Sequence, residues 1–435
     1  MTNKNSPTFA GVIYFTGTGE DFTSNSPSLM QPLSGQPVLQ YTLETLQEVT
    51  GKSAALIVDR EIPILTEKQF LEDVSILLQE DSNPITALES KYKHNADHLL
   101  LAPANMPLLT VSTLKKLMAV HLATDSPPAI TAAYTRSPGK QHFDNQDQRE
   151  YPAGVFCVSA SWLWEIQSQI PNSLTLNSLL SDLVQAASSA GLSVQSFNFI
   201  DPEEALAIES MVDLSKAETL MRLRTNHSLM RSGVTIIDPN TTYVDAGVEV
   251  GQDTTIHPNT YLRGLTRIGE ACQIGPNSLI MDTRIGDRCE VTFSVTESAV
   301  LEDDVDIGPF AHLRKGAHLA QGVHMGNYGE VKNSYLGPGT KMGHFSYIGD
   351  ANIGPGVNIG AGVITANYDG SSKYPTEIGA GAFIGSDTML IAPLKIGAGA
   401  RTGAGSVVNK DVPPNSLAVG IPARIIRKLE DSDGS

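Results

Sequence analysis

The stretch IGEACQIGPNSLIMDTRIGDRCEV, residues 268–291, opens each of its short units with an aliphatic residue. Successive units are six residues long, with a single step of five. No α-helix or ordinary β-hairpin repeats at that interval. A six-residue unit that begins with Ile-Gly is instead typical of a parallel β-helix of triangular section, in which one unit forms one flat face and three units complete a coil. The stretch therefore predicts a left-handed parallel β-helix, called the prism below.

The same period extends from this stretch in both directions. In a prism the aliphatic residue points inward and stacks on its equivalents in neighbouring coils, while glycines and small residues let the chain turn each corner. The five-residue steps are then shortened corners, and the interval between Thr365 and Ile378 is a loop that leaves the prism. Loops on a rigid scaffold often carry functional residues. The unit-opening residues outside the quoted stretch are Val244, Val250, Ile256, Leu262, Leu301, Ile307, Leu313, Leu319, Met325, Val331, Leu336, Met342, Ile348, Ile353, Ile359, Thr365 and those at this spacing from Ile378 to Val408.

The length and composition of the chain set bounds on its class. With 435 residues, of which 41% are hydrophobic, the chain is long enough for two or three domains. The formal net charge of −17 argues against non-specific binding to nucleic acid. The three cysteines, Cys157, Cys272 and Cys289, fit no metal or redox spacing, and we expect buried thiols of a reducing cytosol. Because the sequence shows neither a signal peptide nor eighteen consecutive apolar residues, we expect a cytoplasmic protein with no membrane partner.

The first part of the chain alternates apolar runs with helical patterns. Residues 9–15 (FAGVIYF) predict a buried strand, and Gly17-Thr18-Gly19 predicts a tight turn after it. This alternation predicts a doubly wound, Rossmann-like α/β domain with a ligand site at the carboxyl ends of its strands. The other expected elements are helices at 37–46, 110–122 and 174–190 and strands at 54–58, 98–101 and 154–158.

These patterns divide the chain into four parts. Residues 1–213 form the α/β domain, and 214–233 form a connecting helix. The prism occupies 234–413, and Asp238-Pro239 near its start breaks the helical pattern. Residues 414–435 form a C-terminal tail that begins with Pro414 and ends with the acidic sequence EDSDGS, which we expect to fray.

Five segments of the prism carry a more specific resemblance. They are IGPFAHLRKG, GNYGEVKNSYLG, GHFSYIGDANIG, NIGAGVITANYDGSSKY and FIGSDTMLIAP. Segment by segment they are similar to the acetyltransferase half of the bifunctional N-acetylglucosamine-1-phosphate uridyltransferase / glucosamine-1-phosphate acetyltransferase family. The resemblance implies a homotrimer that transfers acetyl from acetyl-CoA to the 2-amino group of glucosamine 1-phosphate, a small-molecule amino-sugar phosphate, in the biosynthesis of the cell-wall precursor UDP-N-acetylglucosamine.

The catalytic residues implied by this resemblance fit acyl transfer to an amine. Such a reaction needs a base for the amine proton, donors for the developing oxyanion and cations for the sugar phosphate. Imidazole ordinarily titrates near about 6.5 and can serve as the base, and His344 matches the histidine to which the family assigns that role. Glu330 matches a family carboxylate that lies near the histidine and orients its ring.

The resemblance also implies residues that bind the two substrates. Arg314 and Lys332 match the phosphate-binding pair, since Arg offers phosphate a bidentate fork and Lys a point charge. Further sugar-phosphate contacts are matched by Tyr347, Asn358 and Lys373. Contacts to the acetyl group and acetyl-CoA are matched by Asn367, Tyr368, Ala361, Ser386 and Ala404. Without the resemblance, the cations would be read as exposed surface charges, Asn367-Tyr368-Asp369-Gly370 as an Asx turn, and the alanines and serine as the small residues that a prism needs.

One departure from the family occurs near the end of the prism. An arginine of the family that helps to hold the coenzyme phosphates aligns with Gly420 or Ile421 in the sequence AVGIPARII. Arg424 and Arg427 are the two candidates to replace it.

The first part of the chain resembles the uridyltransferase domain of the same family but lacks its chemical residues. The segments SPSLMQPLSGQPVLQYTLETL, NMPLLTVSTL and YPAGVFCVSASWLWEI carry the likeness. Glu20-Asp21 stands in place of a Thr-Arg pair that binds phosphate, Ser28 in place of a lysine, and Asn105 in place of the metal-binding aspartate. The uracil-recognition motif is absent between Leu77 and His98, the second metal-binding asparagine is missing around 209–211, and Glu150 persists without its asparagine partner. We therefore expect that nucleotidyl transfer is lost and that Mg²⁺ is not bound.

Four alternatives stay open. In the first alternative, the acceptor is another amino-sugar phosphate or a nucleotide-linked amino sugar. In the second, the chain still has both the uridyltransferase and the acetyltransferase activity. A third is a metal-dependent prism, because His312, His318 and His324 recur every six residues and would stack in one column. The fourth is a catalytically inactive regulatory or assembly subunit, which would require loss of His344 or of the cations.

Overall fold

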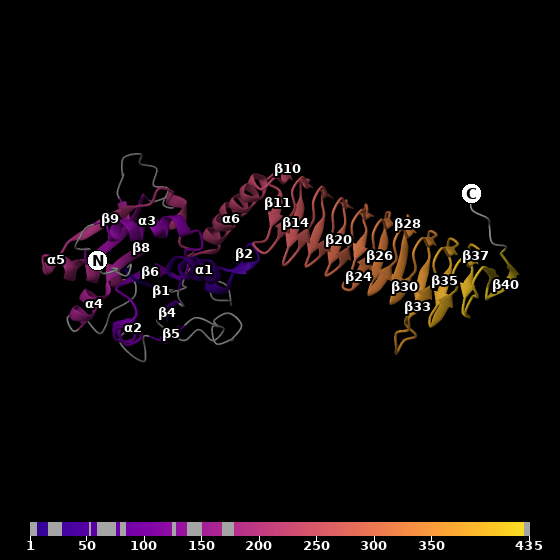
Figure 1. Cartoon of the computed structure of the whole chain (residues 1–435), viewed down its shortest axis with the longest axis horizontal. Coiled ribbons are helices and arrows are strands. Elements are labelled where there is room, and N and C mark those ends of the chain that lie inside the picture. The colour runs from indigo at the N-terminus through magenta and orange to yellow at the C-terminus, as the bar shows by residue number, and fades with distance from the viewer. Residues whose placement is uncertain are drawn as a thin grey trace, which may run out of the picture. The chain divides into compact units, whose positions relative to one another are not determined.

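The computed structural model describes residues 7–15, 28–51, 54–58, 75–78, 84–123, 128–136, 150–167 and 178–429. The chain divides into two compact units, Met1–Met221 and Arg222–Ser435 (Figure 1). The division lies within one helix, α6 (Met211–Arg231), which the sequence predicts at 214–233. The expected Gly17-Thr18-Gly19 turn, the Glu20-Asp21 pair and residues 174–177 of an expected helix lie outside the described residues.

The N-terminal unit is a mixed sheet between two layers of helices. Its strand order is β5-β4-β1-β6-β8-β7-β9, with β1 parallel to β4 and β6 and with β8 antiparallel to β6 and β7. One apolar cluster packs α1 and α3 on one face of the sheet, and another packs α2, α4 and α5 on the other. The elements are β1 (Phe9–Phe15), β2 (Pro32–Leu33), β3 (Gln36–Pro37), α1 (Val38–Thr50), β4 (Ala55–Val58), β5 (Ser75–Leu78), α2 (Pro84–Tyr92), β6 (His98–Pro103), α3 (Val111–His121), β7 (Ile130–Arg136), β8 (Glu150–Ser159), α4 (Ala160–Ile166), α5 (Leu179–Ser189) and β9 (Val194–Asn198).

Each expected element of this unit that lies within the described residues is present, with shifted ends. All seven residues of β1 are buried, as expected for a strand covered on both faces. Local interactions set the helix boundaries. The Thr110 hydroxyl caps the N-terminus of α3, and Gly51 adopts the left-handed conformation that ends α1. The predicted α/β fold is therefore confirmed, with an antiparallel β8 inserted into the sheet.

The C-terminal unit is the predicted prism, with three parallel sheets as its faces (Figure 1). We name the faces after their first strands, as the β10, β11 and β12 faces. The β10 face contains β10 (Thr235–Ile236), β13 (Thr255–Ile256), β16 (Gln273–Ile274), β19 (Glu290–Val291), β22 (Asp306–Ile307), β25 (His324–Met325), β28 (Lys341–Met342), β31 (Asn358–Ile359), β34 (Phe383–Ile384), β37 (Arg401–Thr402), β39 (Ser416–Gly420) and β40 (Ala423–Lys428). The β11 face contains β11 (Thr242–Val244), β14 (Thr260–Arg263), β17 (Leu279–Met281), β20 (Val295–Glu297), β23 (His312–Leu313), β26 (Gly329–Lys332), β29 (Ser346–Gly349), β32 (Ile364–Ala366), β35 (Met389–Ile391) and β38 (Val407–Val408). The β12 face contains β12 (Glu249–Val250), β15 (Arg267–Ile268), β18 (Arg284–Ile285), β21 (Val300–Leu301), β24 (Ala317–Leu319), β27 (Ser334–Leu336), β30 (Ala351–Ile353), β33 (Thr376–Ile378) and β36 (Leu394–Ile396).

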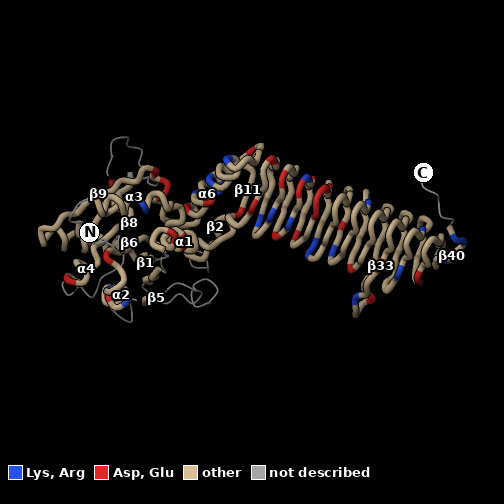
Figure 2. The backbone as a smooth tube through the Cα atoms, in the orientation of Figure 1, with Lys and Arg blue, Asp and Glu red and all other residues tan. Residues whose placement is uncertain are grey.

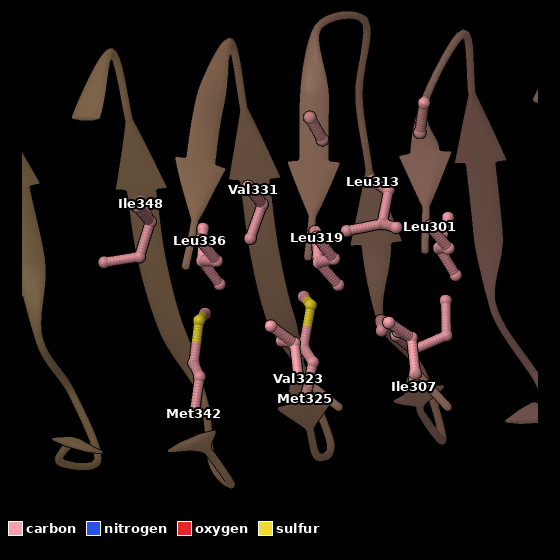
Figure 3. Close-up of a cluster of buried hydrophobic side chains, with 14 of the residues drawn as sticks. Leu301, Ile307, Leu313, Leu319, Val323, Met325, Val331, Leu336, Met342 and Ile348 are labelled. Carbon is pink, nitrogen blue, oxygen red and sulfur yellow. The ribbon is translucent and has the colours of Figure 1, made fainter. Parts of the chain in front are cut away.

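The unit-opening residues form the core of the prism. Figure 3 shows Leu313, Met325 and Leu336 pointing inward from different strands, and all three are fully buried. The expectation holds for the whole series, with Val250 only partly buried and Thr365 buried among the aliphatic residues. Glycine after the inward residue allows the coils to approach closely, since a Cβ at Gly326 would overlap the carbonyl oxygen of Gly343 in the next coil.

The predicted single column of histidines is wrong. His312 lies in β23, His318 in β24 and His324 in β25, on three different faces. Six residues complete one face, so a residue returns to the same column only after three units, as His312 does opposite Glu330. The three imidazoles therefore cannot converge on one metal ion, and each lies near a different carboxylate. Those carboxylates are Glu297, Glu302 and Asp306.

Part of the predicted tail is folded. β39 pairs with β37 and extends the β10 face, and β40 pairs back on β39 in antiparallel fashion. The strands resume after Pro413-Pro414, a pair that interrupts the ladder without ending it. Residues 430–435, the whole acidic sequence EDSDGS, lie outside the described residues.

Two further expectations concern the chain as a whole. Cys157, Cys272 and Cys289 are all buried and unpaired, as predicted. Within the described part of the chain, no helix combines the length and the apolar character needed to span a membrane.

Candidate active site

Three cations gather on the β11 face of the prism. Arg314 follows β23, and Lys332 ends β26 in the next coil. The guanidinium of Arg314 donates to the carboxylate of Glu330 at 2.9 Å, and this hydrogen bond raises the pKa of Arg314. Glu330 in turn lies opposite Tyr347 of the following coil. The strand register thus stacks His312, Glu330 and Tyr347 in neighbouring coils, and Arg314 reaches Glu330 from two residues after His312.

The third cation comes from the loop that leaves the prism between β32 and β33 (Figure 1). Lys373 lies beside Lys332, and its ammonium group lowers the pKa of Lys332. Two adjacent ammonium groups repel each other unless an anion neutralises them. Figure 2 shows that this loop, drawn beside β33, carries both a basic and an acidic segment.

The loop folds back on itself through an Asx turn that begins at Asp369, whereas the expected turn begins at Asn367, whose side chain binds Asp350 instead. The carboxylate of Asp369 accepts hydrogen bonds from the backbone amides of Ser372 at 2.7 Å and Ser371 at 2.8 Å. These bonds lower the pKa of Asp369 to about 2. The backbone N–H of Tyr374 donates to the carbonyl of Asn367 at 2.8 Å, and an isolated β-bridge joins Tyr368 to Lys373.

Gly349 lets the loop reach the β11 face. A Cβ at this position would overlap the hydroxyl oxygen of Tyr347 and would lie 2.9 Å from Nδ2 of Asn367. The Tyr347 hydroxyl and the Asn367 side-chain amide therefore both lie next to the backbone of Gly349, in space that a larger side chain would occupy. Asn367 itself is buried, whereas Tyr368 is exposed.

His344 lies at the corner between β28 and β29 and is exposed. Its imidazole makes no hydrogen bond to any residue that the structure describes. The expected pairing with Glu330 is not present, because the Glu330 carboxylate binds Arg314 instead. The histidine is three residues before Tyr347 and so lies at the edge of the face that carries the cations.

The residues expected to contact acetyl-CoA continue along the same edge of the prism. Backbone hydrogen bonds link Gly362 to Phe345 at 2.6 Å, Asp387 to Ala361 at 2.7 Å and Gly405 to Ser386 at 2.8 Å. Ala361, Ser386 and Ala404 thus occupy the corresponding corner of the coils that follow His344. The edge is open beside them, since Ser386 and Ala404 are exposed.

Asn358 is not brought into this cluster. It lies in β31 on the β10 face, opposite Lys341 and Phe383 of the neighbouring coils. The two faces meet at the corner that carries His344, so the expected substrate residues occupy both sides of one edge.

Two features of the site could not be assigned from the sequence. Asp350 accepts hydrogen bonds from Asn333 at 2.6 Å and from the side-chain amide of Asn367. The GHxxYxGD pattern, whose last residue is Asp350, was the signal for it. The candidate replacements for the coenzyme-binding arginine both lie on β40, where Arg424 pairs with Val419 and Arg427 with Leu417, and both are exposed.

In the described part of the N-terminal unit, residues at the expected nucleotide site make contacts within the unit. The side-chain amide of Asn105 donates to the carbonyl of Ile208 at 3.2 Å, and the Ile208 N–H donates back to the Asn105 carbonyl at 2.8 Å. Near the carboxyl end of β1, the buried Tyr14 hydroxyl donates to the carbonyl of Gly154 at 2.5 Å. Ser28 is buried in a short 3₁₀ turn, and Glu150 accepts a hydrogen bond from Asn198 at 3.0 Å.

Known proteins resemble this chain in both units. Residues 17–188 match the model of the MobA-like NTP transferase domain, and residues 375–410 match the hexapeptide repeat of succinyl-transferase. The bifunctional protein GlmU of Thermotoga petrophila is 35% identical over 439 residues, covering 96% of this chain and 97% of the relative. That of Geotalea uraniireducens is 35% identical, covering 94% and 96%. That of Thermosipho africanus is 36% identical, covering 96% of each chain.

Proposed function

This chain belongs to the GlmU family of bifunctional proteins, and on that premise we propose that it acetylates glucosamine 1-phosphate from acetyl-CoA and has lost uridyltransferase activity. The observation that carries the first half of this proposal is the convergence of Arg314, Lys332 and Lys373 on the β11 face, the face whose other edge carries His344. In a chain with a net charge of −17, three cations around one spot indicate an anionic ligand. A sugar phosphate has the charge that they require.

The phosphate would bind between the guanidinium and the two ammonium groups. Arg314 is already held in one orientation by Glu330, so it presents a fixed fork to the phosphate oxygens. We infer that Glu330 acts on the substrate through Arg314, and that it does not orient His344. A bound phosphate would also remove the repulsion between Lys332 and Lys373.

His344 is the general base of the proposed reaction. Because its ring nitrogens are free of protein partners in the described structure, it can take a proton from the 2-amino group of the sugar. The amine nitrogen forms a bond to the thioester carbonyl carbon, the carbon–sulfur bond breaks, and coenzyme A leaves as its thiol. Asn367 and Tyr368 are positioned by the loop to contact the acetyl group.

Acetyl-CoA would lie along the edge that continues from His344. Ala361, Ser386 and Ala404 leave this edge unobstructed and offer backbone and hydroxyl groups to the pantetheine arm. Arg424 and Arg427 on β40 are the cations that would hold its phosphates.

The site is proposed to lie between copies of the chain in a homotrimer. Asn358 is on the β10 face, whereas Tyr347, Lys332 and Lys373 belong to the β11 face and its loop. One sugar phosphate can contact both sets if the β10 face of one copy meets the β11 face of another.

The loss of nucleotidyl transfer is supported by what occupies the N-terminal site. Mg²⁺ is usually bound through one or two carboxylates together with waters and substrate phosphates. Here the residue is Asn105, whose amide is engaged with Ile208, and the buried Tyr14 hydroxyl takes up the carbonyl of Gly154. We propose that this unit has kept the nucleotidyltransferase fold without its metal.

A second candidate is that both activities persist. The match of residues 17–188 to an NTP transferase domain, and the match to bifunctional relatives over nearly their full length, favour it. Titration calorimetry with UTP and Mg²⁺ separates the two candidates: we expect no binding heat, and tight Mg²⁺-dependent binding would favour the bifunctional protein.

The proposed acetyl transfer is tested with a series of acceptors. Thiol release from acetyl-CoA should be fastest with glucosamine 1-phosphate and slower with glucosamine 6-phosphate, UDP-glucosamine and unphosphorylated glucosamine. A preference for UDP-glucosamine would reassign the acceptor, and no release with any of them would reject acetyl transfer.

A further inference from the structure

Asp350 fastens the projecting loop to the prism. It follows β29 at the corner between the β11 and β12 faces, where its φ is 51°. Its backbone N–H donates to the carbonyl of Lys332 at 3.1 Å, and its carbonyl accepts from the N–H of Thr376 at 3.1 Å. This one corner therefore contacts the strand that carries Lys332 and the returning end of the loop.

Both oxygens of the Asp350 carboxylate are occupied by side-chain amides. Asn333, at the same corner one coil earlier, donates to Oδ1 at 2.6 Å. Asn367, at the start of the loop, donates to Oδ2 through a short hydrogen bond. The first donor is exposed and the second is 7% exposed, so the second bond is the shielded one.

The loop moves as a unit with Asn367, because its own contacts tie its two sides together. The carbonyl of Asn367 accepts from Tyr374, and Tyr368 bridges to Lys373. We propose that Asp350 is a positioning residue of the acetyltransferase, which acts through Asn367 to hold Lys373 beside Lys332 and Tyr368 beside the acetyl group. This inference rests on the proposed function for its kinetic consequence, and on the described contacts alone for the anchoring.

The negative charge of Asp350 also helps to keep Lys373 beside Lys332. Its carboxylate lies close enough to Lys332 and Lys373 to favour the charged forms of both lysines. Without it, two ammonium groups would face each other before the phosphate arrives, and their repulsion would push the loop outward.

A pair of substitutions that exchange the two groups tests the anchor. Asp350→Asn keeps an acceptor for Asn333 but presents an amide to the amide of Asn367, and Asn367→Asp presents one carboxylate to another. Each should release the loop. The double variant restores one donor and one acceptor in reversed order and keeps the total charge, so it should fasten the loop again.

Trypsin reports the position of the loop independently of catalysis. Mass spectrometry of partial digests should find cleavage after Lys373 at least about tenfold faster in either single variant than in the wild-type protein, because cleavage needs local opening. The double variant should return to the wild-type rate. Asn333→Ala, which removes only the exposed donor, is the matched control and should stay within about twofold of wild type. Equal cleavage in all five proteins, or a double variant as labile as the singles, would overturn the anchor.

The kinetic part is measured on Asp350→Asn and Asn333→Ala with acetyl-CoA and glucosamine 1-phosphate. Asp350→Asn should lower kcat and raise KM for the sugar phosphate, with a loss in kcat/KM of about tenfold to a hundredfold and an unchanged Tm. Unchanged kcat/KM together with a released loop would show that the anchor exists but positions nothing. A wild-type protein that protects its loop and transfers no acetyl would instead reject the proposed function and leave the anchor intact.

Discussion

At the scale of single residues, the proposed acetyl transfer depends first on His344 as its general base. Its exposed imidazole contributes nothing visible to packing, so its removal should act on the reaction and not on the fold. We expect His344→Ala to lower kcat for acetyl transfer by about a hundredfold or more, as for loss of a general base, with an unchanged Tm. His227→Ala, at another exposed histidine on α6, is the control and should behave as wild type. Full activity of His344→Ala would assign the base to another group.

A second prediction concerns stability in acid. His121 is fully buried, with its ring nitrogens 2.8 Å from the Thr131 hydroxyl and 3.1 Å from His98. Burial, followed by the nearby His98, lowers the pKa of His121 to about 4. The unfolded chain binds this proton below about pH 6.5, whereas the folded chain does not bind it until about pH 4. The free energy of unfolding should therefore fall as the pH drops from about 6.5 to about 4, by on the order of 3 kcal/mol from this residue.

Urea unfolding of the N-terminal unit between pH 7 and pH 4.5, followed by tryptophan fluorescence, measures this slope. Burial also lowers the pKa of His98, which adds to the slope in the same direction, while Asp97 opposes that shift. His121→Gln should flatten the slope, and His94→Gln, at an exposed position, should leave it unchanged. Identical slopes in all three proteins would show that the pair titrates normally.

At the scale of elements, the loop between β32 and β33 and the end of β26 form one binding feature. Lys332→Ala and Lys373→Ala should each raise KM for glucosamine 1-phosphate by about tenfold or more, because each removes a charge from the phosphate. Lys410→Ala removes an exposed charge near the end of the prism and should change KM little. Loss of kcat at constant KM would place the two lysines in the chemical step instead.

The pH dependence of this binding follows from the lowered pKa of Lys332, which its neighbour Lys373 causes. In the unliganded protein Lys332 loses its charge at a lower pH than an ordinary lysine does. Affinity for the sugar phosphate should therefore weaken on the alkaline side earlier than for a site with an unperturbed lysine. Lys373→Ala removes the cause of the shift, so its residual affinity should hold to higher pH.

The elements of this chain differ in how well the sequence alone predicts them. The prism was predictable because every face of every coil needs an inward-pointing aliphatic residue. The six-residue period can still be recognised where one corner is a residue shorter. The histidine column was wrong because the repeat of six describes one face and not one coil. The N-terminal helices and strands were predictable in type, but the antiparallel β8 depends on pairing between distant segments that no local pattern encodes.

The candidate site residues were assigned only through the family resemblance, and their roles remain predictions. Arg314, Lys332 and Lys373 do lie together, as their matched positions imply. Two contacts depend on which residues of neighbouring coils lie side by side: the pairing of Glu330 with Arg314, and the anchoring role of Asp350. The hydrophobic period of the sequence does not predict such contacts between single exposed side chains.

At the scale of the whole molecule, the division of the expected substrate residues between two faces predicts an oligomer with shared sites. Light scattering should give the mass of a trimer. If one site takes His344 from one copy and Asn358 from another, two inactive variants should complement each other. Mixed trimers of His344→Ala and Asn358→Ala chains, formed by coexpression, should recover part of the wild-type activity, whereas each variant alone should have little. No recovery would place the complete site within a single chain.

The two units also predict different fates for the two family activities. The prism has the polar residues matched to the sugar phosphate but not the coenzyme-binding arginine, whereas the resemblance implies that Asn105 and Ser28 stand at metal-binding and phosphate-binding positions of the N-terminal unit. A fold can outlast its chemistry because packing and catalysis depend on different residues.

The most direct test of this account is a paired assay on one preparation of the wild-type protein. Thiol release is followed with acetyl-CoA and glucosamine 1-phosphate, and pyrophosphate release with UTP, N-acetylglucosamine 1-phosphate and Mg²⁺. We predict thiol release without pyrophosphate release. Pyrophosphate release at a comparable rate would contradict the account, because it would show that the N-terminal unit retains a working phosphate and metal site.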